Sequence, residues 1–392
     1  MTSIVALFIH RYRWGYQIRG DERGFLEKAS EYKSLGIGIW AVEKRPSLEE
    51  TLGENVYTSL SVGDVRLPIR NPIDLFVVIL KSVRKLATLK VGRPVAIYAY
   101  NQDPENVVTG LVFKLILRAP LVIVYHHISA LSLAPLGKGI VERRSRGYGL
   151  FASVWRSSVP ALARFSAKAA DVHLALSSST KSEVELLLGV RSCAVIGNGV
   201  DTLKFRPLDV EMKYDAAFLG RMVHQKGIDT LLRAWSLVSK QQPNPRLILI
   251  GGGDRAELDH FLKIAREVGV LDLVEFRGFV ADEEVVRLLS ASRLFVFPSR
   301  REGFAQAVSQ AMACGLCCVL SDIPSLREIY GDVAVFVPPD DPEELATCIS
   351  RMLDDPVVRR EYGVRAKQFV QKFDWRMVVE RELSEINRCV RS

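Results

Sequence analysis

The chain has 392 residues, of which 48% are apolar, 25% are charged and six are cysteines. A length of this order predicts two or three domains, and the composition excludes a collagen, a disulfide scaffold and a disordered tail. The net charge of +8 is uneven, because residues 1–200 hold 26 Lys/Arg against 16 Asp/Glu. An anionic partner for this half (nucleic acid, anionic lipid or a phosphorylated substrate) and a merely soluble basic surface both remain open.

Strand-like apolar runs alternate with amphipathic helical patterns such as 24–34, 227–239 and 255–268. This alternation predicts parallel sheets covered by helices on both faces. Twelve strands are too many for one such sheet, so we expect two doubly wound α/β domains, with a boundary near 198–214 and a ligand at the carboxyl ends of the strands. The expected strands are Ile4–Ile9, Ile37–Val42, Val95–Tyr100, Leu121–Tyr125, Val172–Leu176, Cys193–Ile196, Ala216–Leu219, Leu247–Ile250, Val274–Phe276, Leu294–Phe297, Cys318–Leu320 and Val333–Val337.

No apolar run in the sequence reaches the ~20 residues that a membrane-spanning helix needs. The best run, Val107–Tyr125, is interrupted by Lys114, Arg118 and Pro120. At the start of the chain, Ile4–Ile9 is too short for a signal-peptide core, and no basic region precedes it. We therefore expect a cytoplasmic protein that can rest on the cytoplasmic face of a membrane.

The segment Lys138–Phe165 combines basic residues with Tyr148, Phe151 and Trp155. This mixture suits an anionic membrane surface. A solvated helix with an apolar stripe toward the core fits the same pattern.

Two glycine-containing turns in the second half follow predicted strands. Gly220 begins a turn that carries Arg221 and Lys226, and a guanidinium with an ammonium just beyond a strand suits a diphosphate. A solvated basic loop is the plain alternative. Gly251 and Gly252 open the second turn, which suits phosphate or backbone contact but lacks the glycine spacing of the dinucleotide fingerprint. A further turn at Phe279 and Val280 offers backbone to a flat base.

The segment from Phe295 to Gly315 reads as a strand, a loop and a helix of small residues. The loop presents Glu302, and free N–H groups at the start of the helix would stabilise an anion. Glu302 is either an acidic residue favoured by the helix dipole or a carboxylate that binds hydroxyl groups. Gln310 lies about two helical turns further on and is expected to share a face with Glu302.

Together these motifs resemble the retaining glycosyltransferases of family 4, which have the GT-B fold. The resemblance covers most of 172–390 and extends more weakly into the N-terminal half. The motifs that carry it are Gly220-Arg221 with Lys226-Gly227, Gly251-Gly252-Gly253, Glu302-Gly303-Phe304, Gly315 to Asp322, Ile196 to Pro207, Phe373-Asp374-Trp375, Arg19 to Arg23, Leu121 to His127 and Leu176 to Lys181.

The resemblance implies two Rossmann-like domains that face a cleft: an acceptor-binding domain over 1–200 and a donor-binding domain over 201–372. A C-terminal helix over 373–392 crosses back. It also implies transfer from a nucleotide-diphosphate sugar to an acceptor hydroxyl, lipid-linked or on a polysaccharide, with retention and without a metal or other cofactor.

The resemblance also assigns roles to residues. Arg221 and Lys226 hold the diphosphate, Glu302 binds hydroxyls of the donor sugar, and His126, with His127 as the fallback, contacts its far end. The acceptor side includes Gly20 and His127. The expected donor-binding residues are Gly220, Gly251, Gly252, Phe279, Val280, Gly303, Phe304, Ala305 and Gln310.

Gln310 stands where the family has a second glutamate. An amide oxygen can still accept a hydrogen bond from a ribose hydroxyl, so we expect altered affinity rather than lost chemistry. A nucleotide-sugar-binding pseudoenzyme and a GT-B phosphorylase are the alternatives. A nucleic-acid partner is not expected, because no nucleic-acid-binding motif is present.

Three cysteines, Cys314, Cys317 and Cys318, lie close together in the sequence, and Cys317 replaces the proline usual in the family. A zinc or redox site would need more ligands or a thioredoxin-like context. We therefore expect small core residues and no metal site.

Overall fold

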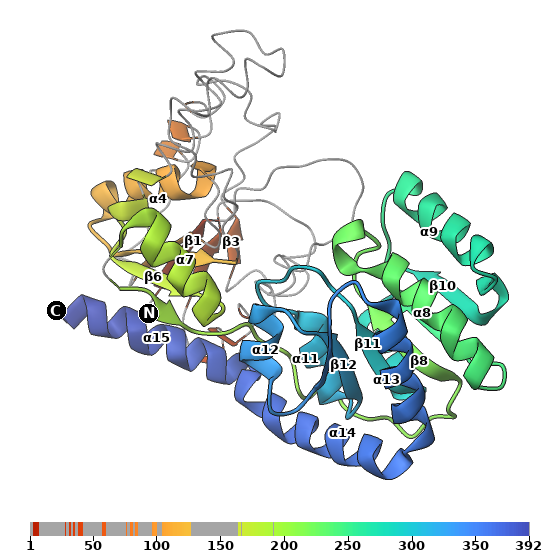
Figure 1. Cartoon of the computed structure of the whole chain (residues 1–392). Helices are drawn as coiled ribbons and strands as arrows, with labels where there is room; N and C mark the ends of the chain where they lie inside the picture. The colour runs from red at the N-terminus through yellow and green to blue at the C-terminus, as the bar shows by residue number, and fades with distance from the viewer. Residues whose placement is uncertain are drawn as a thin grey trace, which may run out of the picture. The chain divides into compact units, whose positions relative to one another are not determined.

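The computed structural model describes residues 3–7, 28, 31–32, 34–35, 38–41, 57–59, 76, 79–80, 83–84, 96–99, 104–126, 164–165, 167–190 and 192–391. The chain divides into two compact units, one formed by Met1–Gly197 with Trp375–Ser392 and the other by Asn198–Asp374. Each unit is built on a parallel sheet (Figure 1). The expectation of an α/β chain with two doubly wound sheets is therefore confirmed.

The first unit contains a sheet whose described strands have the order β3-β2-β1-β4-β5-β6-β7. Every residue of β4 and β5 is buried, as expected for central strands covered on both faces. The strands are β1 (Ser3–Leu7), β2 (Gly38–Ala41), β3 (Tyr57–Ser59), β4 (Ala96–Ala99), β5 (Leu121–Tyr125), β6 (Val172–Ala175) and β7 (Ala194–Val195).

Three helices of this unit are α4 (Pro104–Leu117), α7 (Ser178–Leu188) and α15 (Trp375–Arg391). The Ser177 side chain accepts a hydrogen bond from the Thr180 N–H and caps α7, as a serine before a helix is expected to do. Although α15 comes last in the sequence, it packs beside β6 and belongs to the first unit.

The second unit contains a sheet with the strand order β10-β9-β8-β11-β12-β13. The chain runs outward from β8 through β9 to β10, returns to β11 beside β8, and continues in the opposite direction. The order therefore reverses between β8 and β11. The strands are β8 (Tyr214–Leu219), β9 (Leu247–Ile250), β10 (Val274–Gly278), β11 (Ser292–Phe297), β12 (Cys317–Ser321) and β13 (Val335–Val337).

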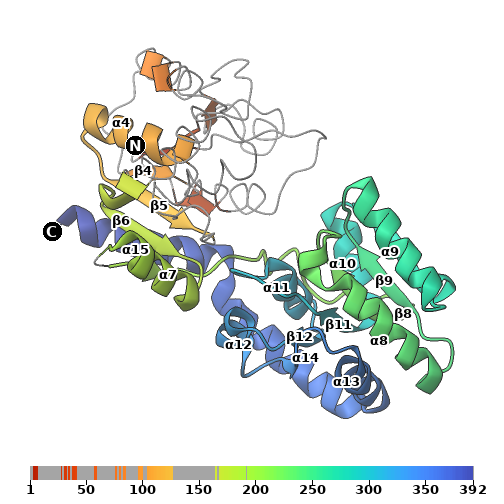
Figure 2. The same cartoon turned by 45° about the horizontal axis from the view of Figure 1, so that its top comes forward.

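The helices of the second unit cover its sheet in two groups, since right-handed crossovers on either side of the reversal lie on opposite faces. In one group α8 packs against α9 and α13, and in the other α11 packs against α14 (Figure 2). Trp235 and the stacked rings of Phe218 and Phe297 are fully buried in the core of the second unit. The helices are α8 (Ile228–Gln241), α9 (Arg255–Glu267), α10 (Asp282–Ser290), α11 (Gln306–Ala313), α12 (Pro324–Tyr330), α13 (Pro342–Asp354) and α14 (Pro356–Val370).

Each expected strand overlaps an observed one, but β3 was not expected. Its three residues, Tyr57–Ser59, are too few to give a readable alternation. The expectations for Gly20, His127 and the segment 19–23 lie outside the described residues, as does all of Lys138–Phe165 except Arg164 and Phe165.

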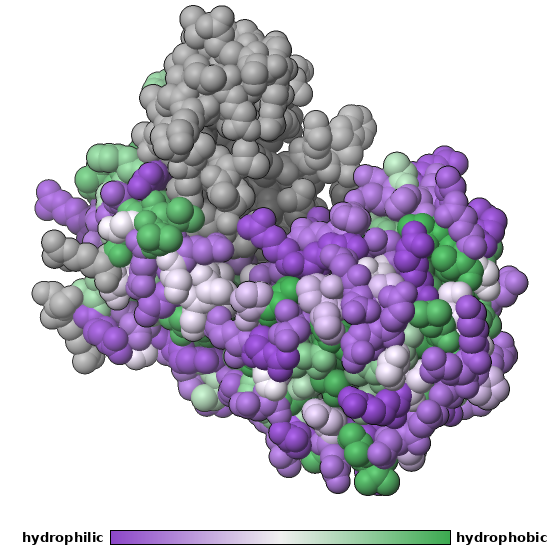
Figure 3. All heavy atoms as spheres, viewed as in Figure 1, coloured by the Kyte–Doolittle hydropathy of each residue, from purple (hydrophilic) through white to green (hydrophobic). Residues whose placement is uncertain are grey.

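In the part of the chain that the structure describes, no helix is long and apolar enough to cross a membrane. Hydrophilic residues predominate over the described part of the face in Figure 3, and apolar side chains are interspersed among them.

Candidate active site

The candidate site lies where the strand order of the second sheet reverses. Loop 220–227 follows β8, loop 298–305 follows β11, and these two strands are hydrogen-bonded neighbours. Both loops leave the carboxyl ends of their strands. In open α/β sheets a reversal of this kind is the usual place for a ligand.

Lys226, Glu302 and Ser299 meet at this reversal. The Lys226 ammonium forms an ion pair with Oε1 of Glu302, and the Ser299 hydroxyl donates to the same oxygen at 2.6 Å. The Lys226 and Glu302 side chains are only 14% and 9% exposed, and the ammonium also lies 5.1 Å from the centre of the Phe297 ring. Since both bonds reach Oε1, the second oxygen, Oε2, accepts none from the described residues and remains available to a ligand hydroxyl.

Arg221 and the start of α11 supply positive potential beside this pair. The Arg221 side chain is exposed, and within the described residues it has no ion pair. The N–H groups of Gly303, Phe304 and Ala305 likewise donate to none of the described residues, and they precede the N-terminus of α11. A phosphate oxygen can therefore be bound by a guanidinium, by backbone donors and by the helix dipole.

The Phe304 side chain is used for packing. Its ring lies edge-on to Phe373 at 5.2 Å and to Tyr330 at 6.1 Å, and the Tyr330 hydroxyl donates to the Ala305 carbonyl at 3.0 Å. These contacts fix the loop, so only the backbone of Phe304 is left to bind a ligand.

The glycine turn after β9 is shaped by its neighbours. The Gly251 N–H already donates to the Gly278 carbonyl at 2.8 Å. A Cβ atom on Gly252 would lie 2.2 Å from the Phe279 ring, so a side chain at this position would displace that ring. The Phe279 ring remains 51% exposed, whereas Val280 packs on the core. An exposed aromatic ring is therefore available at the carboxyl end of β10.

Gln310 is buried in α11, and its side-chain amide makes no hydrogen bond to the described residues. The expectation that helical periodicity places Gln310 on one face with Glu302 is wrong, because α11 begins at Gln306 and Glu302 lies in the preceding loop. The eight-residue spacing is therefore not two turns of one helix.

His126 belongs to the first unit and directly follows β5. The preceding residue, Tyr125, is fully buried, and its hydroxyl lies 3.0 Å from Nδ1 of His173 on β6. Burial lowers the pKa of His173 to about 4, so this imidazole is neutral near pH 7. The Tyr125–His173 pair thus fixes the end of the strand from which His126 emerges.

The three neighbouring cysteines all lie in the core of the second unit, as expected. Burial raises the pKa of Cys314 and of Cys317 to about 12, and raises that of Cys318 as well. Protonated, buried thiols are poor metal ligands and poor nucleophiles.

The family called "Glycosyl transferases group 1" matches residues 200–369, and the family called "Glycosyltransferase Family 4" matches residues 20–204. The two matched regions overlap at 200–204 and together cover residues 20–369, which include every described strand except β1. The chain belongs to the group 1 glycosyltransferases of family 4. The resemblance seen in the motifs is thereby confirmed.

Curated relatives in this glycosyltransferase family match mainly over part of their length. O-antigen chain mannosyltransferase B of Escherichia coli is 32% identical over 41% of this chain and 42% of its own length. Alpha-maltose-1-phosphate synthase of Mycolicibacterium smegmatis is 29% identical over 68% of this chain and 73% of its own length. The chain thus spans less than half of the first relative and about three quarters of the other.

Solved structures establish the GT-B fold of this glycosyltransferase along its whole length. Sucrose-phosphate synthase from Thermosynechococcus elongatus aligns with a TM-score of 0.76 at 19% identity, covering 100% of this chain and 99% of the other. HepE of Anabaena, solved with UDP and glucose, aligns with a TM-score of 0.73 at 18% identity, covering 99% and 100%. At these identities the likeness concerns the fold alone.

Two polar residues of the candidate site were not singled out from the sequence. Ser299 and Arg300 precede Glu302, and each also has a partner about 70 residues earlier in the chain, Gln225 and Asp229 respectively. The sequence contains only a weak indication of these residues: a serine and an arginine just after a strand, and an aspartate in the first turn of α8.

Proposed function

We propose that the chain transfers a sugar from a nucleotide-diphosphate donor to an acceptor hydroxyl, with retention at the anomeric carbon and without a metal ion. The observation that carries this proposal is the orientation of the Glu302 carboxylate. Lys226 and Ser299 hold Oε1, and Oε2 is left for hydroxyls of the donor sugar. A carboxylate held in one orientation selects a sugar by its hydroxyl pattern.

The departing diphosphate requires the largest electrostatic stabilisation. Arg221, Lys226 and the N–H groups of Gly303–Ala305 would offset the charge that develops on it. Donors already fixed in place need little reorganisation at the moment of transfer. The acceptor hydroxyl then attacks from the face that the diphosphate leaves, and a phosphate oxygen takes its proton.

The remaining roles follow the same assignment. Gly220, Gly251 and Gly252 line the donor side, and the exposed Phe279 ring offers a surface for the base. Gln310 accepts a ribose hydroxyl, and His126 contacts the far end of the sugar. The net +10 of residues 1–200 favours an anionic, lipid-linked acceptor at a membrane surface.

The proposal is tested with a panel of UDP-, GDP- and ADP-sugars in the presence of EDTA. Nucleotide release is measured with and without membrane lipid extract. UDP-glucose and GDP-mannose come first, because HepE was solved with UDP-glucose and one relative is a mannosyltransferase. Release from one donor, stimulated by lipid, is the expected result.

Glu302→Ala should lower this release by about 10²- to 10³-fold, the usual cost of losing one fixed polar group in an active site. Glu283→Ala, which removes an exposed carboxylate on α10, is the matched control and should leave release unchanged. Release that EDTA abolishes, or that survives in the Glu302 variant, contradicts the proposal.

The second candidate is a nucleotide-sugar-binding protein without turnover. The observation that favours it is Gln310, a buried amide at the position of the family's second glutamate. Donor binding with no release under any acceptor would support this alternative. Gln310→Glu would then be the next variant, and restored release would identify the substitution as the cause.

A further inference from the structure

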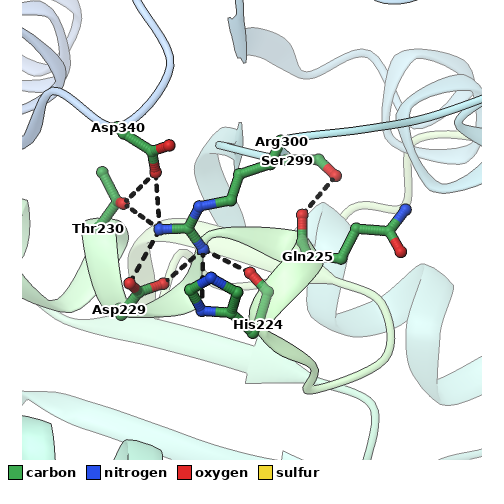
Figure 4. A network of polar contacts seen from close by, with 7 residues as sticks. All are labelled: His224, Gln225, Asp229, Thr230, Ser299, Arg300 and Asp340. Carbon is green, nitrogen blue, oxygen red and sulfur yellow. Dashed lines mark hydrogen bonds and ion pairs between the residues drawn. The ribbon is translucent and has the colours of Figure 1, made fainter. Parts of the chain in front are cut away.

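Arg300 lies at the centre of a polar network beside the proposed site (Figure 4). Its two terminal nitrogens donate to the two carboxylate oxygens of Asp229 at 2.8 and 2.9 Å. Nη2 also lies 2.6 Å from Oδ1 of Asp340 and 3.2 Å from the Thr230 hydroxyl, and Nη1 donates to the His224 carbonyl. One guanidinium thus connects the loop after β11 with the start of α8 and with the loop before α13.

Backbone contacts join the same segments. The Arg300 N–H donates to the Gln225 carbonyl at 2.9 Å, and the Ser299 hydroxyl lies 3.2 Å from that oxygen. In return the Gln225 side chain donates to the Arg301 carbonyl at 2.7 Å. The segment 299–301 is therefore fastened along the turn that precedes α8.

The fastened segments carry the two side chains that we propose bind the donor. Lys226 directly follows Gln225, and Glu302 directly follows Arg301. The Arg300 side chain itself points toward Asp229, Thr230 and Asp340 (Figure 4). A shift between the two loops would therefore change the separation of Lys226 and Glu302 without changing either side chain.

The ion pair between Arg300 and Asp229 is largely shielded from solvent. The Arg300 and Asp229 side chains are only 19% and 20% exposed. Burial opposes ionisation of Asp229, but the hydrogen bonds and charge of Arg300 outweigh it and lower the pKa of this carboxyl. A lysine ammonium lacks the planar fork needed to reach both Asp229 oxygens and Asp340 together, so lysine is not an equivalent replacement.

We propose that Arg300 is a positioning residue. It holds loop 298–305 against residues 224–230 at the separation at which Lys226 and Glu302 engage the donor, and it does not touch the donor. This inference rests on the proposed transferase function and assigns that function a further residue. Arg300 acts on turnover through loop geometry, and its side chain is directed at Asp229 and Asp340.

The test compares Arg300→Lys with Arg287→Lys. Arg287 also forms a two-bond pair, with Glu284 at 2.7 Å, but on α10 away from both loops. Arg300→Lys should lower kcat about 10- to 100-fold, because small misplacements of reacting groups cost this much. The KM for the donor should change by less than about threefold. Arg287→Lys should leave both values unchanged.

Asp340→Asn, a milder change at a half-exposed partner, should lower kcat to a value between those of the wild type and Arg300→Lys.

Hydrogen exchange supplies a second readout that needs no turnover. Peptides covering 224–230 and 299–305 should exchange faster in Arg300→Lys than in the wild type, while the rest of the second unit is unchanged. If the wild type turns over no donor, the proposed function fails, and this exchange alone decides the role of Arg300. The positioning role is overturned if Arg300→Lys exchanges like the wild type, or if its kcat equals that of Arg287→Lys. It is also overturned if Arg300→Lys raises only the KM for the donor.

Discussion

At the scale of single residues, the site depends on how Ser299 orients a carboxylate. The Ser299 side chain is fully buried, and its hydroxyl donates to Oε1 of Glu302. A hydrogen bond to a charged group contributes about 1.5–3 kcal/mol. The bond therefore contributes both to the orientation of Glu302 and to the stability of the loop.

Ser299→Ala should lower kcat for donor turnover about tenfold or more, since 1.4 kcal/mol corresponds to a factor of ten. The affinity for the free nucleotide diphosphate should change little, because the shortest bond of Ser299, at 2.6 Å, goes to the carboxylate that we propose binds the sugar, and its contact with the Gln225 carbonyl is longer at 3.2 Å. Steady-state kinetics and nucleotide titration measure the two quantities. Ser292→Ala is the matched control, since Ser292 is also buried but lies at the opposite end of β11. Equal kinetics in the two variants would rule out an orienting role for Ser299.

The sequence was enough to single out Lys226 and Glu302, because each occupies a short motif directly after an apolar strand. It did not indicate that the two side chains form an ion pair, nor that Oε1 takes both bonds. Those facts depend on which strands are neighbours. The partners of Arg300 lie in other segments of the chain, at the start of α8 and in the loop before α13, and no local pattern connects them.

At the scale of elements, two loops fit closely because Gly227 has no side chain. Gly227 has a φ of +67°, and a Cβ atom there would lie 2.0 Å from the Pro298 carbonyl oxygen. The turn before α8 and the loop after β11 can touch only with glycine at this position. The same contact brings Lys226 beside Glu302.

Gly227→Ala should therefore lower the free energy of unfolding by more than backbone strain alone would, because the new Cβ atom also clashes with the Pro298 carbonyl oxygen. Gly269→Ala isolates that strain, because Gly269 has a φ of +73° with no atom within 4 Å of its Cβ position. Left-handed backbone costs alanine about 1–2 kcal/mol, which corresponds to a fall in Tm of about 2–8 °C. The Tm of Gly227→Ala should fall further than that of Gly269→Ala, and Gly227→Ala should also lower donor turnover. Thermal unfolding and turnover of both variants check this, and equal Tm values would refute the steric argument.

The strands could be predicted because parallel strands buried on both faces read as continuous apolar runs. The β5 run, Leu121–Tyr125, is one such case, with every residue buried. The three-residue β3 lies at the edge of the first sheet, where pairing depends on its neighbour β2. The relation of Gln310 to Glu302 was misjudged for a similar reason, since the start of α11 is set by tertiary contacts.

At the scale of the whole molecule, the first unit contains both ends of the chain. Glu382 on α15 is fully buried, and Tyr98 and Tyr32 donate to its two oxygens at 2.6 Å each. Lys28 forms an ion pair with Oε1, and burial lowers the Lys28 pKa against the opposing effect of Glu382. A buried charged pair of this kind fixes the register of α15 on the unit.

Glu382→Gln should destabilise the first unit by about 3–5 kcal/mol, because it removes a buried carboxylate that is paired with the buried Lys28. The double variant Lys28→Met/Glu382→Gln removes both charges, and the amide oxygen can still accept from a tyrosine. It should therefore be more stable than the sum of the single variants predicts. Glu385→Gln, which alters a pair with the exposed Arg388 on the same helix, should have little effect on stability.

Urea unfolding measures the stability of each variant, and proteolysis of α15 gives a local readout. Strict additivity of the two single variants would mean that Lys28 and Glu382 stabilise α15 independently, and α15 would then be held mainly by its apolar face.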